Sequence, residues 1–310
     1  MCKICRNEPL EGLKTLYCTN CSLLTEIPNI EGLKILDCSN CPLLTEIPNI
    51  KGLNTLYCSK CPLLTEIPNI KGLKILDCSG CPLLTEIPNI KKLIYLNCSN
   101  CPLLTKIPNI EGLLYLDCSN CPLLTEIPNI KGLARLFCSN CTLLTKIPNI
   151  EELKTLDCYE CPLLTEIPNI KGLVRLFCSN CTLLTKIPNI EELKTLDCYE
   201  CPLLVKLPNF RHLTYFNEIS FTKELLSARY ILTCFRYKFK IPIKSKQLFK
   251  INLEKYSEHI LDDYVNPNSK YMKYYVNDIC STPFDNDFEE KLKIGYLSKD
   301  NNELKMLTLK

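Results

Sequence analysis

Ten pairs of cysteines are the residues of this 310-residue chain best suited to chemistry. Each pair has the spacing Cys-x-x-Cys, from Cys18 and Cys21 to Cys198 and Cys201. Thiolates at this spacing supply half of a tetrahedral zinc site, which needs a second pair of ligands. Only two histidines are present, so histidine cannot complete ten such sites. A metal function of the repeated pairs would therefore depend on cysteine alone.

The repeated cysteines have two other possible uses. Cysteines in neighbouring units could form disulfides, but such bonds need a specific dihedral angle and an oxidising compartment. A free cysteine packs as a small apolar side chain and is among the most buried residue types. We therefore expect core cysteines, with metal binding and disulfides as the alternatives, and we predict no cofactor. Cys2 and Cys5 lie outside the repeated pairs and are better metal candidates, although the sequence shows no obvious partner pair for them.

The cysteine pairs belong to a longer pattern, L-x-x-L-x-C-x-x-C-x-L-L-T-x-I-P-N-I-x-x, that returns every 20 residues. Ten full units run from Leu13 to about His212. Leu16 and Cys18, with their equivalents, share one face of a short strand. The Ile-Pro-Asn-Ile segment returns along the opposite side, where proline favours an extended chain. One unit cannot bury its own apolar face, so the units must stack.

This pattern resembles the leucine-rich repeat family, in which Asn or Cys often occupies the position of the second cysteine. The short unit and its Ile-Pro-Asn-Ile segment are similar to the compact repeats of bacterial effectors and to repeat proteins of giant DNA viruses. The resemblance implies an α/β leucine-rich-repeat solenoid with a parallel β-sheet on its concave face. It also implies an extended, polyproline-like convex side with little helix, and a protein partner bound on the concave strand face.

The strand positions that flank the inward leucine differ among otherwise similar units. The position after this leucine holds aspartate in every second unit and mostly an aromatic residue in the others. Exposed aromatic and arginine side chains are typical of protein interfaces, although neutral drift of surface residues is the alternative explanation. The predicted partner-binding residues are Asp37, Tyr57, Asp77, Tyr95, Tyr115, Asp117, Arg135, Phe137, Asp157, Tyr159, Arg175, Phe177, Asp197 and Tyr199.

Charge excludes a nucleic-acid-binding array. Residues 1–212 contain 21 Lys and Arg and 21 Asp and Glu, so no basic stripe can follow a phosphate backbone. Charged residues flank each Ile-Pro-Asn-Ile segment, and their signs change together, as in Glu86 with Lys91 and Lys106 with Glu111. We expect neighbouring columns of opposite sign to offset the repulsion within each column.

Composition divides the chain into three predicted regions. Residues 1–12 form an incomplete N-terminal cap, residues 13–221 form the repeat array, and residues 222–310 form a helical C-terminal cap or small domain. Apolar spacing from Leu225 to Phe235 and over residues 248–265 favours helices in the last region.

The predicted function is a non-catalytic protein–protein interaction scaffold, because no nucleotide-binding loop or Ser/His/Asp set is present. We expect a monomer that binds a protein but no nucleic acid or membrane. The chain opens without an apolar leader and has no run of roughly 18 apolar residues, which predicts a reducing, cytoplasmic location, including a host cytoplasm.

Two alternative functions remain open. The first is an effector-like enzyme whose C-terminal region modifies a target held by the repeats. Neither Cys234 nor Cys280 precedes aspartate by two residues, as the catalytic cysteine of the effector ubiquitin ligases does. The second alternative is a metal- or redox-responsive cysteine array.

Overall fold

The structure, a computed structural model, describes residues 1–204, 207–208, 210 and 212–217. All of them lie in the first of two compact units of the chain, Met1–Phe221. The helices predicted in residues 222–310 fall outside the described residues. They remain a prediction, as do the boundaries of the three regions.

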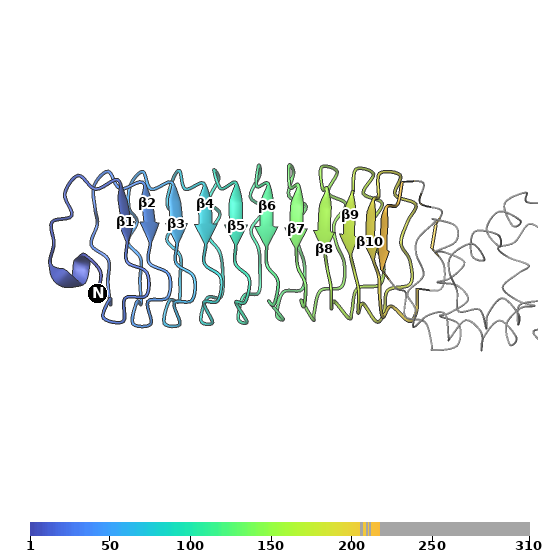
Figure 1. Cartoon of the computed structure of the whole chain (residues 1–310), viewed down its shortest axis with the longest axis horizontal. Helices are drawn as coiled ribbons and strands as arrows, with labels where there is room; N and C mark the ends of the chain where they lie inside the picture. Colours follow the sequence, from blue (N-terminus) through green and yellow to red (C-terminus); the bar gives the residue numbers. More distant parts are fainter. Residues whose placement is uncertain (205–206, 209, 211, 218–310) are drawn as a thin grey trace, which may run out of the picture. The chain divides into compact units, whose positions relative to one another are not determined.

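Eleven short parallel strands form a single sheet, in which each strand pairs with the next one along the chain (Figure 1). Their register is strictly repetitive, since Thr15 lies opposite Ile35 and Leu16 opposite Leu36. Equivalent positions therefore form straight columns, which confirms the predicted stacking of 20-residue units. The strands are β1 (Thr15–Tyr17), β2 (Ile35–Asp37), β3 (Thr55–Tyr57), β4 (Ile75–Asp77), β5 (Tyr95–Asn97), β6 (Tyr115–Asp117), β7 (Arg135–Phe137), β8 (Thr155–Asp157), β9 (Arg175–Phe177), β10 (Thr195–Asp197) and β11 (Tyr215–Asn217).

The return segment of each unit is extended, as predicted. Within the described residues the only helix is the single 3-10 turn η1 (Ile4–Arg6). The backbone N–H of Ile50 donates to the carbonyl of Pro48 at 2.9 Å, which closes a three-residue turn at Asn49. The same bond recurs from Ile70 to Pro68 and in four later units. Proline therefore bends the chain without losing a ladder hydrogen bond.

Seven positions of each unit form the core between the strands and the return segment. In the second unit each of them is at most 6% exposed. Burying one large aliphatic side chain contributes about 1.5–3 kcal/mol to stability, and these side chains pack largely against neighbouring units. The seven residues of this unit are Leu33, Leu36, Cys38, Cys41, Leu44, Ile47 and Ile50.

The chain leaves each strand through a turn with a left-handed residue. The residue before the second cysteine has a positive φ in all ten units, for example 57° at Asn40. Asparagine occupies this position in six units, which fits its tolerance of left-handed backbone. Gly80 also suits this conformation, whereas Lys60, Glu160 and Glu200 adopt it at a steric cost.

No helix in the described part of the chain has both the length and the apolar character needed to cross a bilayer.

Candidate functional site

The exposed face of the sheet carries most of the predicted partner-binding residues. In β1–β10 the central leucine is buried, and the residues on either side of it point to the opposite face of the sheet. On β7, for example, Arg135 is exposed and Phe137 half-buried, with Leu136 buried between them. Twelve of the fourteen predicted residues lie on strands, whereas Tyr159 and Tyr199 lie in the turns after β8 and β10. We call the outward side chains of β1–β11 the strand face.

Three aromatic side chains form a cluster near the middle of the strand face. The rings of Tyr95 and Tyr115 stack with centroids 4.4 Å apart and an interplanar angle of 11°. Phe137 lies 5.3 Å from Tyr115 in a tilted arrangement. Arg135 stands next to Tyr115 in the sheet register and is exposed. The aromatic cluster therefore presents a rigid, half-exposed apolar surface beside a cation.

Burial moves the pKa of the two phenols of the aromatic cluster further above physiological pH. Burial, followed by the neighbouring Tyr115, raises the pKa of Tyr95 to about 12. Burial also raises the pKa of Tyr115. Both hydroxyl groups are therefore neutral hydrogen-bond donors at physiological pH.

The aspartates of the strand face hold the adjacent turns. The Oδ1 atom of Asp77 accepts hydrogen bonds from the N–H of Ser79 at 3.0 Å and from its hydroxyl at 2.7 Å. Asp117 accepts the N–H of Ser119 at 3.0 Å in the same way. A carboxylate that bonds the backbone two residues ahead forms an Asx turn, which the Asp-Cys-Ser sequence could have revealed. These aspartates thus have a structural role that sequence reasoning missed.

The two arginines of the strand face differ in the hydrogen bonds of their guanidinium groups. Both Nε and a terminal guanidinium nitrogen of Arg175 donate to the hydroxyl of Thr155 on the neighbouring strand, at 3.2 and 3.1 Å. Arg135 is the neighbour of Thr155 on the other adjacent strand, β7. The guanidinium of Arg175 is therefore already positioned by the sheet.

The second cysteine of each unit from Cys41 onward hydrogen-bonds to the preceding unit. The thiol of Cys41 donates to the carbonyl of Cys18 at 3.1 Å, and that of Cys121 to the carbonyl of Cys98 at 3.3 Å. The same contact continues to Cys201. We call this row of nine bonds the thiol ladder. The thiol ladder explains why the second cysteine position of each unit needs a side chain that can donate a hydrogen bond.

The first cysteine of each unit is a core residue. Burial raises the pKa of the Cys58 and Cys98 thiols well above the ordinary value. The Cys118 thiol lies 3.5 Å from the carbonyl of Phe137, which already accepts the N–H of Cys118 at 2.8 Å. These thiols are therefore protonated and packed. The described cysteines are all free thiols.

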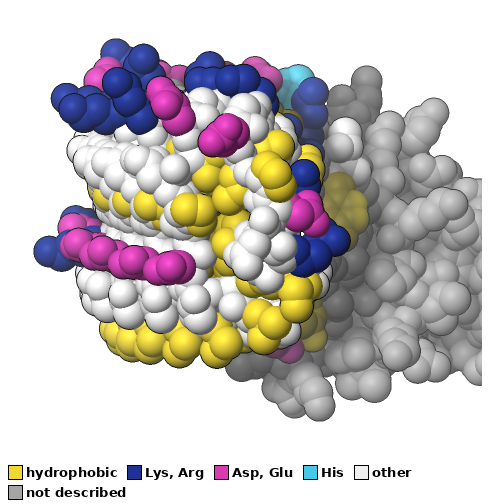
Figure 2. Space-filling model, turned by 90° about the vertical axis from the view of Figure 1, so that its left-hand side faces the viewer, with side chains coloured by type: hydrophobic (Ala, Val, Ile, Leu, Met, Phe, Trp, Pro, Cys, Tyr) yellow, Lys and Arg dark blue, Asp and Glu magenta, His cyan; other side chains and the backbone are white. Residues whose placement is uncertain are grey.

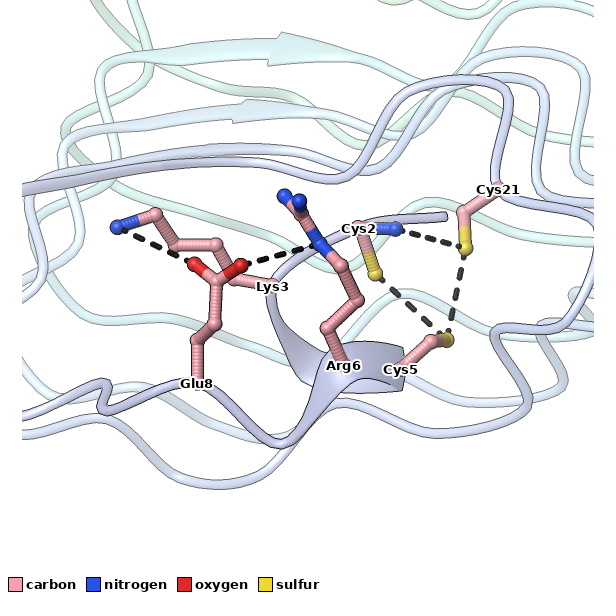
Figure 3. A network of polar contacts seen from close by, with 6 residues as sticks. All are labelled: Cys2, Lys3, Cys5, Arg6, Glu8 and Cys21. Carbon is pink, nitrogen blue, oxygen red and sulfur yellow. Dashed lines mark hydrogen bonds and ion pairs between the residues drawn. The ribbon is translucent and has the colours of Figure 1, made fainter.

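Cys21 differs from the other second cysteines because the residues before its unit form η1 and not a strand of the sheet. The structure instead places it beside Cys2 and Cys5, and the three Sγ atoms lie within 4.8 Å of one another (Figure 3). Burial opposes ionisation of Cys21, but the N–H groups of Cys2 and Leu23 outweigh it and lower its pKa to about 7. The sequence signal for this contact is the spacing Cys-x2-Cys-x12-Cys-x2-Cys, which ends at Cys21.

Exposed leucines form a further row that sequence reasoning did not single out. The first leucine of each Leu-Leu pair lies in the turn after the thiol ladder and is 37–56% exposed, from Leu23 to Leu203. Figure 2 shows hydrophobic side chains gathered in rows on the surface of the array. Only the second leucine of each pair, such as Leu24, is buried.

The charged columns beside the return segment are solvated. Glu86 pairs with Lys106, and Glu166 with Lys186, through backbone bridges between units. In the described residues, side-chain ion pairs within 4 Å occur at Glu8, with Lys3 and with Arg6. A continuous row of acidic side chains is visible on the surface (Figure 2). The charge before Ile-Pro is thus negative in the first four units and alternates in sign only from Glu86 to Lys186, without close side-chain ion pairs among these described residues.

A parallel sheet with one strand per 20-residue unit and an extended return defines a solenoid of short repeats. Residues 32–51, 72–90 and 92–113 match the family model of the Leucine Rich Repeat. The repeat array therefore contains leucine-rich repeats in these three segments. None of the curated protein sequences matches it.

Three solved structures resemble the chain in fold. YopM from Yersinia enterocolitica WA-314 has a TM-score of 0.49 at 23% identity over 66% of this chain, and the match spans 50% of YopM. The leucine-rich repeat domain of the type III effector XCV3220 (XopL) has a TM-score of 0.46 at 20% identity, over 66% of this chain and 76% of the domain. A leucine-rich repeat protein from Bacteroides ovatus ATCC 8483 has a TM-score of 0.43 at 18% identity, over 67% of this chain and 76% of its own.

Proposed function

We propose that the chain is a non-catalytic scaffold that binds a protein partner on its strand face. The observation that carries this proposal is the aromatic cluster of Tyr95, Tyr115 and Phe137 beside exposed Arg135. Leucine-rich repeats are generally protein-interaction scaffolds, and aromatic and arginine side chains are the commonest sources of binding energy at protein interfaces. The rings are fixed by stacking, so binding would cost little side-chain entropy.

The remaining strand-face residues extend this surface. Asp77 and Asp117 flank the cluster, and each keeps part of its carboxylate beyond the turn that it holds. A partner with apolar side chains and a basic rim fits this arrangement. We also propose that the protein is a monomer and that it functions in a reducing compartment such as the cytoplasm of a host cell. Its partner on the strand face is then neither a nucleic acid nor a membrane.

The proposal disfavours a metal- or redox-responsive array. Cysteines of both columns, for example Cys98 and Cys101, are fully buried, and each second-column thiol from Cys41 onward bonds a carbonyl of the preceding unit. Metal binding by these thiols would need their ionisation and the loss of that contact. An enzymatic C-terminal region stays a separate hypothesis, because Cys234 and Cys280 lie outside the described residues.

Affinity capture with the full chain tests the proposal. The triple variant Tyr95→Ala, Tyr115→Ala, Phe137→Ala removes the aromatic cluster, and we expect it to lose the proteins that the wild type captures. Truncating one hot-spot residue costs about 2 kcal/mol or more, which is roughly a thirtyfold loss of affinity. Because such losses are not additive, we expect a loss of at least about a hundredfold for the set.

A matched control removes similar apolar surface elsewhere. The variant Leu83→Ala, Leu103→Ala, Leu123→Ala changes three side chains that are 40–41% exposed in the leucine row. It should retain the captured partner. Equal capture by the wild type and the folded aromatic variant would contradict the proposed surface.

A further inference from the structure

The N-terminal thiols of Cys2, Cys5 and Cys21 are arranged differently from every other cysteine contact in the described array. The Cys2 and Cys5 sulfurs are 3.7 Å apart, and the Cys5 and Cys21 sulfurs are 3.5 Å apart. In a tetrahedral zinc site with Zn–S bonds of about 2.3 Å, sulfur atoms are roughly 3.8 Å apart. The three sulfurs thus already stand close to one triangular face of such a tetrahedron.

The local backbone holds this arrangement. Residues 4–6 form η1, and the N–H of Arg6 donates to the carbonyl of Cys2 at 3.2 Å, so Cys2 and Cys5 turn toward the same side. Glu8 stabilises the same turn through ion pairs with Arg6, at 3.0 Å, and with Lys3, at 3.9 Å (Figure 3). The N–H of Cys2 donates to the sulfur of Cys21 at 3.4 Å. Hydrogen bonds of this kind orient the ligands of metal sites.

We propose that Cys2, Cys5 and Cys21 bind one zinc ion that fastens the N-terminal segment to the first repeat. Cys18 lies outside this group of three sulfurs, so it would complete the tetrahedron only by turning its thiol toward the ion. Two Cys-x-x-Cys pairs separated by about 15–20 residues are a frequent zinc-binding pattern. Here the separation is somewhat shorter, from Cys5 to Cys18. Only sulfur ligands are present, which suits a closed structural site.

Position along the array explains why zinc would bind only here. From Cys41 onward, each second cysteine donates its proton to a carbonyl of the preceding unit, and a metal-bound thiolate cannot do so. Cys21 packs against η1 and accepts a hydrogen bond from the N–H of Cys2 instead. Cys5 is half-buried, so an ion can reach the site from solvent. Each ligand thiol releases one proton to solvent as Zn²⁺ binds, so binding strengthens as the pH rises.

Metal content of the full chain tests this proposal. We expect native mass spectrometry and elemental analysis to find one zinc ion per chain in protein made with zinc under reducing conditions. The variants Cys2→Ser and Cys5→Ser should bind none. The control Cys61→Ser, which changes a thiol-ladder residue, should keep the ion. Cobalt(II) should give sulfur-to-metal charge-transfer absorption in the wild type and in Cys61→Ser, and none in Cys5→Ser.

A second measurement needs no substitution. Removing zinc from the wild type with a chelator should speed amide hydrogen exchange in residues 2–24 and leave exchange in β5–β8 unchanged. The proposal is overturned by wild-type protein without stoichiometric zinc or by full retention of zinc in folded Cys5→Ser. A disulfide among the three cysteines in protein purified under reducing conditions would also overturn it.

Discussion

The two cysteines of one unit differ in how much their thiol hydrogen bonds contribute to stability. The Cys121 thiol is the donor to the Cys98 carbonyl, whereas the Cys118 thiol points to a carbonyl that a backbone N–H already satisfies. A buried carbonyl that loses its donor costs about 1–3 kcal/mol. The donor is therefore essential only in the second column.

Exchanging each cysteine for serine or alanine should reveal this difference. We expect Cys121→Ala to destabilise the chain by about 1–3 kcal/mol and Cys121→Ser to cost less, because serine keeps a donor. At Cys118 the order should reverse, since a buried hydroxyl gains little from a carbonyl that is already bonded. Urea unfolding of the four variants measures this, and the same order at both positions would contradict the assignment.

The left-handed turn residue offers a stabilising substitution. Lys60 has a φ of 55°, a conformation that asparagine tolerates better than lysine. We expect Lys60→Asn to raise the free energy of unfolding by up to about 1 kcal/mol. The reverse exchange, Asn40→Lys at the equivalent position, should lower it by a similar amount. A stability change of the same sign for both variants, measured by urea unfolding, would exclude this explanation.

Residue types predicted the core columns but not all of the polar contacts. The inward positions follow from apolar spacing, and the exposure of Arg135 follows from strand alternation. The hydrogen bonds of Asp77 depend on the turn geometry after the strand, and the neighbours of Cys5 depend on how η1 folds back. Contacts outside the repeat cannot be inferred from the repeat.

At the scale of elements, one strand with its return segment is the unit of folding. The second to ninth units each bury seven core residues against their neighbours, and the bonds between units recur at 20-residue intervals. The sequence was sufficient to predict the parallel strands and the helix-poor return, because ten repetitions leave only one register. It did not predict η1, for which no second copy exists.

Removing one whole unit should leave a folded array. Deletion of residues 51–70 joins Ile50 to Lys71, which keeps the repeat in phase and removes β3. We expect a cooperative urea transition whose m-value is lower by roughly a tenth, in proportion to the lost buried surface. Deletion of residues 51–60 alone breaks the phase and should lower the midpoint far more. Equal midpoints for the two deletions would contradict the modular account.

At the scale of the whole molecule, the buried thiols couple stability to pH. Burial raises the folded-state pKa of Cys38, Cys58, Cys78, Cys98 and Cys198 well above the ordinary value. Unfolded thiols ionise near pH 8.5. Above that pH the unfolded chain loses protons that the folded chain keeps, so the stability that is intact below pH 8 is lost as the pH rises.

This coupling predicts alkaline unfolding. Between pH 8 and 9.5 each of these thiols should cost about 1 kcal/mol of stability, so the free energy of unfolding should fall by several kcal/mol. Urea midpoints at the two pH values measure the loss, and Cys58→Ala should reduce it by about 1 kcal/mol. A midpoint that does not change over this range would mean that the thiols are not buried as described.

The strand face as a partner-binding surface is the central claim, and site-specific photo-crosslinking tests it most directly. A photoreactive phenylalanine analogue in place of Tyr115 lies in the aromatic cluster, whereas the same analogue in place of Glu126 lies beside the exposed return segment. We predict that the partner cross-links through position 115 and not through position 126. Cross-linking through position 126 alone would contradict the claim.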